Sequence, residues 1–197
     1  MVVCTSTMTG EIMAKHKHII NLTEVPVEKI NAPEGSVFGG TRQRVGAHVG
    51  AQKLGYSFFT VPPGRTAFPY HNHTGNEEMI YIIAGGGVLR LGKDELAVSA
   101  DTVIACPPGD FPHQLINTGS GELRYLVVST MAYPDISEYP DSNKIGAYAT
   151  SAGRPQAGFR ALYVKDRNVT YYDGEDGKEV QRILRSARRD DKDAPAT

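Results

Sequence analysis

Short apolar runs alternate with turn residues through the middle of the chain, and no stretch there keeps the periodicity of a helix. Between residues 56 and 130, runs rich in β-branched and aromatic residues, such as YSFFTV, EMIYIIA and LRYLVVST, are separated by clusters of Gly, Pro, Asn and Asp. The turns recur roughly every 8 to 12 residues, which is typical of an all-β barrel or sandwich. The pattern therefore predicts an all-β fold whose core strands lie in residues 56–130.

Three features precede or interrupt these strands. Residues 1–20 are polar, which predicts a flexible leader. The run TEVPVEKI predicts a short turn of helix that Asn21 or Thr23 would cap and that Pro26 would limit. Three consecutive glycines at 85–87 lack the strand-then-helix context of a phosphate-binding loop, so they predict a tight hairpin instead.

The segment after the core strands differs from them in its sequence pattern. Residues 131–175 predict a loop-rich C-terminal extension in which FRALYVKD and NVTYYDG form a hairpin or two edge strands. Residues 176–197 predict a charged tail that starts as a short helix and cannot form a core. The chain has 197 residues and no internal repeat, which predicts one domain over residues 21–175 between the leader and the tail.

Composition and charge argue against several classes of function. The 21 basic and 22 acidic residues give a net charge of -1, so no basic field is expected to attract nucleic acid or an anionic membrane. No apolar run approaches the roughly 18 residues of a transmembrane helix, and a secretory signal is not expected. The two cysteines, Cys4 and Cys106, are interpreted as reduced thiols. These features predict a cytoplasmic protein that binds neither nucleic acid nor membrane.

Three histidines and one glutamate are candidate metal ligands. His71 and His73 are two residues apart, so on a strand their imidazoles project to the same face. Glu78 begins the next strand on an apolar face, where a carboxylate is costly unless it is paired or bound to a metal. His113 lies just before the run LIN, and a barrel would bring that strand across from the first. The four side chains therefore predict one cation site.

The donor set indicates which cation is expected. Three neutral imidazoles and one carboxylate suit one divalent transition-metal ion, such as Fe(II), Mn(II), Ni(II), Cu(II) or Zn(II), rather than Ca²⁺ or Mg²⁺. On an octahedral ion, four protein ligands would leave two positions for water or a small-molecule substrate. His16 and His18 repeat the same spacing, but they have no nearby partners in the sequence and are expected to be inert.

The segment PPGRTAFPYHNHTGNEEMIYIIAGGG resembles the first conserved motif of the cupin superfamily. In that motif a glycine precedes two histidines that are one residue apart, and a glutamate and a second glycine follow. Gly64, His71, His73, Glu78 and Gly85 take these places. Of the two adjacent glutamates, the second has the four residues before it and the six after it that the motif requires.

The segment ADTVIACPPGDFPHQLIN resembles the second cupin motif. Pro107, Gly109, His113 and Asn117 take its conserved positions, with three residues between the histidine and the asparagine as in the family. The spacings before His71 and before His113 are each one residue longer than usual, and loop insertions explain both without changing a ligand. The two motifs together contain every metal ligand that the family uses.

The resemblance implies a double-stranded β-helix, that is a jelly-roll barrel, with the metal inside and with N-terminal and C-terminal extensions. The wider stretch, including EYPDSNK, resembles single-domain bacterial cupins that are commonly labelled sugar-phosphate or mannose-6-phosphate isomerases. This resemblance implies a metal-dependent enzyme that acts on a small polar or sugar-like substrate. Two alternatives stay open: an Fe(II)-type dioxygenase, and a non-catalytic module that binds a metal or a small molecule.

Other candidates concern the substrate and the partner. Arg65, Arg90 and Arg124 lie on or near the predicted strands and are the arginines available for a phosphate, but each is interpreted as a solvated strand residue. The sequence identifies no catalytic base, because a ligand count does not reveal one. Small cupins commonly pair through a sheet face, and apolar residues on both faces of residues 78–84 predict a homodimer.

Overall fold

The computed structural model divides the chain into two compact units, Met1–Lys165 and Asp166–Thr197. All named strands belong to the first unit. The second unit holds most of a 3-10 turn, η3 (Lys165–Arg167), and a helical turn at residues 178–182, where the tail was predicted to start as a helix. Most of the predicted leader and tail lies outside the described residues, which are 16–109, 111–149, 159–170, 172–174 and 178–182.

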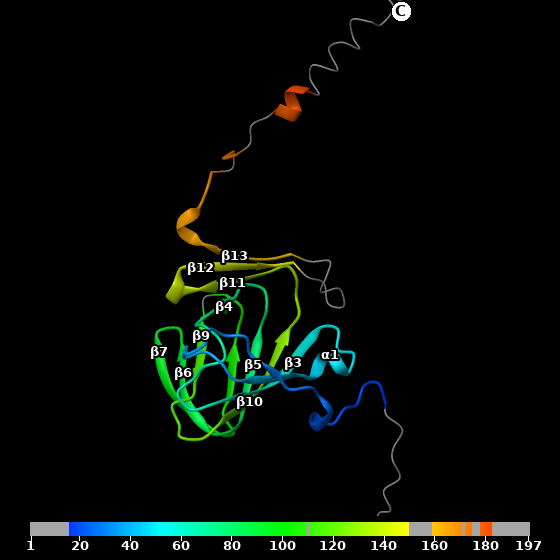
Figure 1. Cartoon of the computed structure of the whole chain (residues 1–197), viewed down its shortest axis with the longest axis vertical. Coiled ribbons are helices and arrows are strands. Elements are labelled where there is room, and N and C mark those ends of the chain that lie inside the picture. Colours follow the sequence, from blue (N-terminus) through cyan, green and yellow to red (C-terminus); the bar gives the residue numbers. More distant parts are fainter. Residues whose placement is uncertain (1–15, 110, 150–158, 171, 175–177, 183–197) are drawn as a thin grey trace, which may run out of the picture. The chain divides into compact units, whose positions relative to one another are not determined.

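Antiparallel strands form three sheets in the first unit (Figure 1). The six-stranded sheet consists, in spatial order, of β1 (Glu28–Lys29), β2 (Thr41–Arg44), β3 (Leu54–Val61), β10 (Leu123–Thr130), β5 (Glu78–Ala84) and β8 (Val103–Cys106). The three-stranded sheet consists of β7 (Asp94–Ser99), β6 (Gly86–Leu91) and β9 (His113–Ile116). The four-stranded sheet consists of β13 (Arg160–Val164), β12 (Lys144–Tyr148), β11 (Asp135–Tyr139) and β4 (Asn72–His73). The short helices are η1 (Leu22–Glu24), α1 (Val45–His48) and η2 (Pro140–Ser142).

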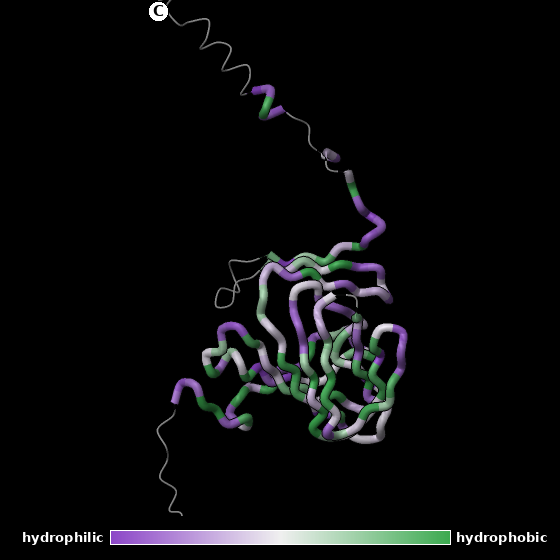
Figure 2. The backbone as a smooth tube through the Cα atoms, turned by 180° about the vertical axis from the view of Figure 1, so that it is seen from behind, coloured by the Kyte–Doolittle hydropathy of each residue, from purple (hydrophilic) through white to green (hydrophobic). Residues whose placement is uncertain are grey.

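The hydrophobic core lies between the six-stranded and the three-stranded sheets. Ile82 and Leu123 of the first sheet are almost completely buried, and they belong to the same apolar cluster as Leu89 and Leu115 of the second. Figure 2 shows that hydrophobic stretches coincide with the strands of this barrel. Because alternate side chains of each strand enter the core, two polar-faced sheets close around one apolar interior. The chain thus forms the predicted all-β jelly-roll barrel.

The start of the barrel follows its local sequence signals. The Asn21 side chain caps η1 by accepting a hydrogen bond from the Thr23 N–H at 3.0 Å. The turn ends at Glu24, two residues before Pro26, so the rest of the run TEVPVEKI, which was predicted to join it, is not helical and contains β1 instead. The predicted strand EMIYIIA is also confirmed, since β5 has the same first and last residues.

The three glycines at 85–87 do not form the predicted tight hairpin. β5 pairs with β10 and β8, whereas β6 pairs with β7 and β9, so the glycines carry the chain from one sheet into the other. A side chain at Gly85 would overlap the Glu122 carbonyl oxygen, and one at Gly87 would overlap the Ile116 carbonyl oxygen. Glycine is therefore needed here because backbones approach closely, and a prediction from turn residues alone was wrong.

The C-terminal extension is more ordered than the predicted loop-rich segment. Residues 135–148 contain β11 and β12, which pair with each other along five residues. The run FRALYVKD supplies β13, as predicted, but its ladder partner is β12. The described residues of NVTYYDG contain no strand, so the predicted pairing of these two runs is wrong. Figure 1 shows the sheet of β11, β12 and β13 lying across one end of the barrel, next to β4.

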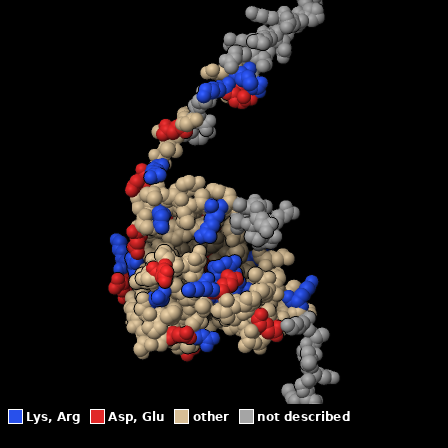
Figure 3. Space-filling view, viewed as in Figure 1, with Lys and Arg blue, Asp and Glu red and all other residues tan. Residues whose placement is uncertain are grey.

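One face of the barrel unit shows no concentration of one charge among the described residues (Figure 3). Figure 3 presents one face, on which acidic and basic side chains of the barrel unit are interspersed. Such a mixed surface lacks the field that would steer a polyanion to this face. Among the described residues, no helix has the length and apolar character needed to span a bilayer.

Candidate metal centre

The structure brings the four predicted ligands together on the inner wall of the barrel. His73 ends β4, Glu78 begins β5 and His113 begins β9. His71 precedes β4 and forms an isolated antiparallel bridge with His113. In that bridge the His71 N–H donates to the His113 carbonyl oxygen at 3.2 Å, and the His113 N–H donates to the His71 carbonyl oxygen at 2.8 Å.

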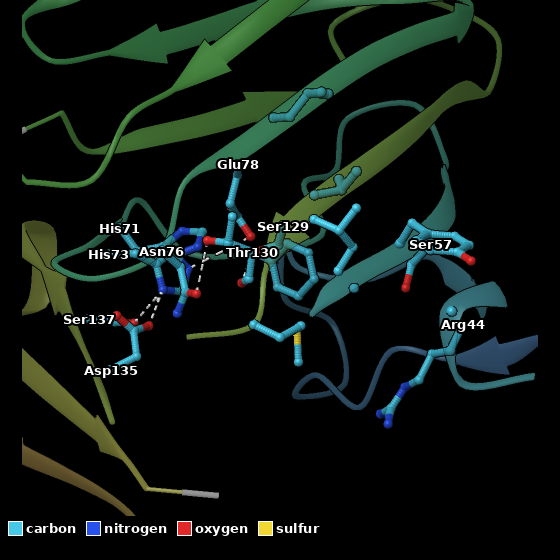
Figure 4. Close-up of a pocket in the computed structure, with 18 of the residues that line it drawn as sticks. Arg44, Ser57, His71, His73, Asn76, Glu78, Ser129, Thr130, Asp135 and Ser137 are labelled. Atoms are coloured by element: carbon cyan, nitrogen blue, oxygen red, sulfur yellow. Dashed lines mark hydrogen bonds and ion pairs between the residues drawn. The ribbon is translucent and has the colours of Figure 1, made fainter. Parts of the chain in front are cut away.

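The Glu78 carboxylate lies among the imidazoles. Its Oε2 is 3.2 Å from His113 Nε2 and its Oε1 is 3.9 Å from His73 Nε2. The ring centre of His71 is 5.2 Å from that of His73 and 4.8 Å from that of His113. His71, His73 and Glu78 each offer a ligand atom, and these atoms lie within 4.8 Å of one another (Figure 4). The adjacent Glu77, which strand alternation places on the other face, is exposed.

Hydrogen bonds behind the imidazoles set which nitrogen faces the centre. His71 Nδ1 donates to the Pro69 carbonyl oxygen at 2.8 Å, because a carbonyl can only accept. His73 Nδ1 donates to the Asp135 carboxylate at 2.6 Å, and the Ser137 hydroxyl lies 3.1 Å from the same nitrogen. When Nδ1 carries the proton, Nε2 of a neutral imidazole keeps a free lone pair. Both side chains are therefore oriented as metal ligands commonly are.

Asp135 and Ser137 are site residues that the sequence analysis missed. Both are buried, and they come from β11 in the segment that was interpreted as loops. The register pairs Ser137 with His73, and the Gly75 N–H donates to the second Asp135 oxygen at 3.1 Å. The run DISEY did contain a signal, because strand alternation places its first, third and fifth residues on one face. The fifth residue of the run, Tyr139, lies on the same face as Asp135 and Ser137, and its ring stacks on that of His71 with ring centres 6.0 Å apart.

Electrostatics keep His71 neutral and Glu78 ionised. Burial, together with the nearby His113 and His73, lowers the pKa of His71 to about 4. Burial alone would raise the pKa of Glu78, but the hydrogen bond with His113 and the neighbouring imidazoles lower it to about 2. At neutral pH the centre therefore offers an uncharged imidazole beside a carboxylate, which is the form in which both groups bind a cation.

His113 has the opposite shift. Burial disfavours its charged form, but its interactions with Cys106 and Glu78 outweigh this and raise its pKa to about 10. Cys106 was interpreted as part of the barrel wall, and it is indeed buried in the core cluster, although it also interacts with His113. It is the partner of Glu78 in the β5–β8 register. At neutral pH, His113 thus holds a proton next to the carboxylate.

A cation at this centre would have to displace the proton of His113. At pH values below the pKa of His113, we expect the affinity for Zn(II) to increase about tenfold for each unit by which the pH rises, because one proton is released per ion bound. Calorimetric titration in buffers of different ionisation enthalpy measures the number of protons released. Zn(II) affinity that does not change with pH would contradict this assignment.

The donor set fits a divalent transition-metal ion. Two imidazoles are oriented by partners behind them, a third faces the carboxylate, and all four groups are withdrawn from solvent. Such nitrogen and oxygen donors match the preferences of first-row transition metals. Burying a carboxylate and three imidazoles costs free energy, and a bound cation would offset this cost.

A cavity of about 780 Å³ extends from the centre through the barrel. The candidate phosphate ligands Arg65, Arg90 and Arg124 do not line it. Arg90 instead makes two bonds of 2.7 and 3.0 Å to the Asp141 carboxylate, and Arg65 donates to a loop carbonyl. The cavity is lined by two other arginines, Arg44 and Arg160. The sequence therefore predicted the candidate metal donors but not the arginine side chains that line the cavity.

The second histidine pair lies elsewhere. His18 Nδ1 is 2.9 Å from the Val49 carbonyl oxygen, and the His16 and His18 rings contact each other with centres 5.4 Å apart. Neither residue lines the cavity or belongs to the metal-ligand group found among the described residues. Their expected inertness stays a prediction that metal analysis of variants can test.

The fold and the site define a class of protein: a jelly-roll barrel with a histidine and glutamate group that could hold a metal ion. Residues 57–129 match the family described as "Cupin domain". This segment is similar to cupin domains and makes up less than half of the chain, and both motifs recognised in the sequence lie within it. No protein of curated function matches the chain.

Several solved structures share this fold. A protein from Acidithiobacillus ferrooxidans, for which sugar phosphate isomerase activity is suggested, has 20% identity and a TM-score of 0.65, over 78% of this chain and 96% of the other. A protein from Silicibacter pomeroyi, described as a sugar phosphate isomerase of the cupin superfamily, has 21% identity and a TM-score of 0.66, over 79% of this chain and 98% of the other. The polyketide cyclase RemF from Streptomyces resistomycificus has 25% identity and a TM-score of 0.50, over 62% of this chain and 84% of the other. The first two likenesses cover more of the chain than the cupin domain alone.

Proposed function

We propose that the chain binds one divalent transition-metal ion through His71, His73, Glu78 and His113, and that it is a metal-dependent isomerase of a small sugar-like substrate. The carrying observation is that His71, His73 and Glu78 form a group that could hold a metal ion, with His113 in contact with Glu78 and His71, on the wall of a cavity large enough for such a substrate. The names of the two structural likenesses from Acidithiobacillus ferrooxidans and Silicibacter pomeroyi support the same substrate class.

The bound ion would supply Lewis-acid polarisation of a substrate carbonyl and its adjacent hydroxyl. The chain's own residues would orient the reacting atoms and limit access of water. Tyr139, stacked on His71, has its pKa raised by burial and by its hydrogen bond with Tyr148, so it stays protonated at neutral pH and can donate. Asp135 would keep the His73 lone pair directed at the centre.

One observation favours a second candidate, a non-catalytic metal-dependent receptor. Isomerisation needs a base beyond the metal ligands. Among the described residues that line the cavity, the carboxylates are Glu78 and Asp135, and each already has a histidine partner. A receptor would need no such base. An Fe(II)-type dioxygenase would use the same metal ligands, and the experiment described next also tests this alternative.

Anaerobic incubation of the metal-loaded full chain with ribose 5-phosphate or fructose 6-phosphate tests the proposal. We expect interconversion of aldose and ketose, followed by NMR, and its loss after chelation of the metal. Substrate-dependent oxygen uptake in air would instead support the dioxygenase. Metal-dependent sugar binding without any turnover would support the receptor.

A further inference from the structure

The cavity contains a positive charge that no carboxylate balances among the described residues. Of its two arginines, Arg44 pairs with Glu28 at 3.2 Å. For Arg160 the described residues provide no ion pair, and its guanidinium lies over the Tyr148 ring, 5.5 Å from the ring centre. Figure 4 shows Arg44 on the far side of the cavity from His71 and His73. The unbalanced charge is therefore that of Arg160.

Strand register places Arg160 on the side of the metal centre. Tyr148 of β12 is the direct partner of Asp135 on β11 and of Arg160 on β13. Directly paired residues share one face of a sheet, and all three line the cavity. At one end of this row of three paired residues, the Asp135 carboxylate accepts a hydrogen bond from His73. The other end presents the guanidinium to the same cavity.

Two tyrosine hydroxyls complete this part of the wall. The hydroxyls of Tyr139 and Tyr148 are 2.7 Å apart, so one donates to the other. Whichever donates, the accepting hydroxyl retains a proton for an outside acceptor. A guanidinium beside a hydroxyl donor is suited to a phosphate or carboxylate oxygen, since charge-assisted hydrogen bonds to anions are strong. The ring of Tyr139 also contacts His71, so a series of contacts through the two tyrosines connects the guanidinium with the metal donors.

We propose that Arg160, with the hydroxyl pair of Tyr139 and Tyr148, forms a subsite for the anionic group of the substrate. A substrate held there has a phosphate or carboxylate at one end and its polar carbons toward the metal donors. The placement of those carbons rests on the proposed function, whereas anion binding by Arg160 does not. The extension, and not the cupin domain, supplies all three residues of the subsite.

Calorimetry of the metal-loaded full chain with ribose 5-phosphate, glucuronate and neutral ribose tests the subsite. We expect at least one anionic sugar to bind more tightly than ribose, and Arg160→Gln to weaken that binding about tenfold or more. Arg160→Lys should retain part of the affinity. The matched control is Arg124→Gln, an exposed strand arginine outside the cavity, which should change nothing. Comparison of the phosphate with the carboxylate identifies the preferred anion.

Three results would overturn the subsite: anions that bind no better than ribose, unchanged affinity in Arg160→Gln, or an equal loss in Arg124→Gln. Metal content and turnover are measured on the same samples. Arg160-dependent anion binding without metal or turnover would leave the subsite standing and reject the proposed function. Normal metal binding with no preference for anions would reject the subsite alone.

Discussion

Replacing Glu78 with Ala should remove most of the bound metal from the purified protein. Among the residues that the structure describes, the negative charges in contact with the imidazoles are this carboxylate and that of Asp135, which lies behind His73. We expect the affinity for Zn(II) to fall by more than about a hundredfold, since even the loss of an outer partner costs 10- to 100-fold. Elemental analysis and competition with a chromophoric chelator measure the loss. His71→Ala should behave in the same way.

The adjacent Glu77 provides a matched control. Glu77→Ala removes the same side chain one residue earlier, from an exposed position on the other face of the strand. It should retain full metal, as should His16→Ala and His18→Ala, whose rings lie outside the cavity. Full metal in both Glu78→Ala and His71→Ala would show that the donors are wrongly assigned. Metal loss in the His16 or His18 variants would mean that the leader takes part in the site.

The proximity of the candidate metal donors was largely predictable because it depends on short-range geometry. Strand alternation alone places His71 beside His73, whereas the spacing of the cupin motif distinguishes Glu78 from Glu77. The run EMIYIIA, rich in β-branched and aromatic residues and ending at three glycines, likewise predicted the bounds of β5. The position of His113 depended on barrel closure, which the motif spacing implied. Homodimer formation and a cytoplasmic location stay predictions from the sequence.

The remaining features were not predictable because they depend on contacts distant along the chain. The glycines at 85–87 have the composition of a turn, but the carbonyls that require them belong to Glu122 and Ile116. The run DISEY looks like a loop between Tyr-Pro-Asp triplets, and it becomes a strand only because β4 and β12 pair with it. Arg160 could not be assigned to the cavity before the register of β13 with β12 was known.

Asp135→Asn should weaken metal binding by about 10- to 100-fold, although residue 135 is not proposed to touch the metal. The Asp135 carboxylate accepts the His73 Nδ1–H at 2.6 Å and thereby fixes the tautomer and the ring. The amide is the same size but uncharged, and its NH₂ group can turn toward the ring and favour the wrong tautomer. Competition titrations with Zn(II) give the affinity, and the visible spectrum of the Co(II) form reports any change in ligand geometry.

Asp141→Asn is the control for this experiment, because the Asp141 carboxylate also has a side-chain partner, Arg90, but lies outside the cavity. It should leave both the affinity and the Co(II) spectrum unchanged. If Asp135→Asn bound metal as tightly as the original chain, with the same spectrum, the carboxylate would not position His73. A loss of affinity with a normal thermal unfolding curve would separate positioning from folding. Because Asp135 lies beyond residues 57–129, that result would mean that the cupin domain and its extension build the metal centre jointly.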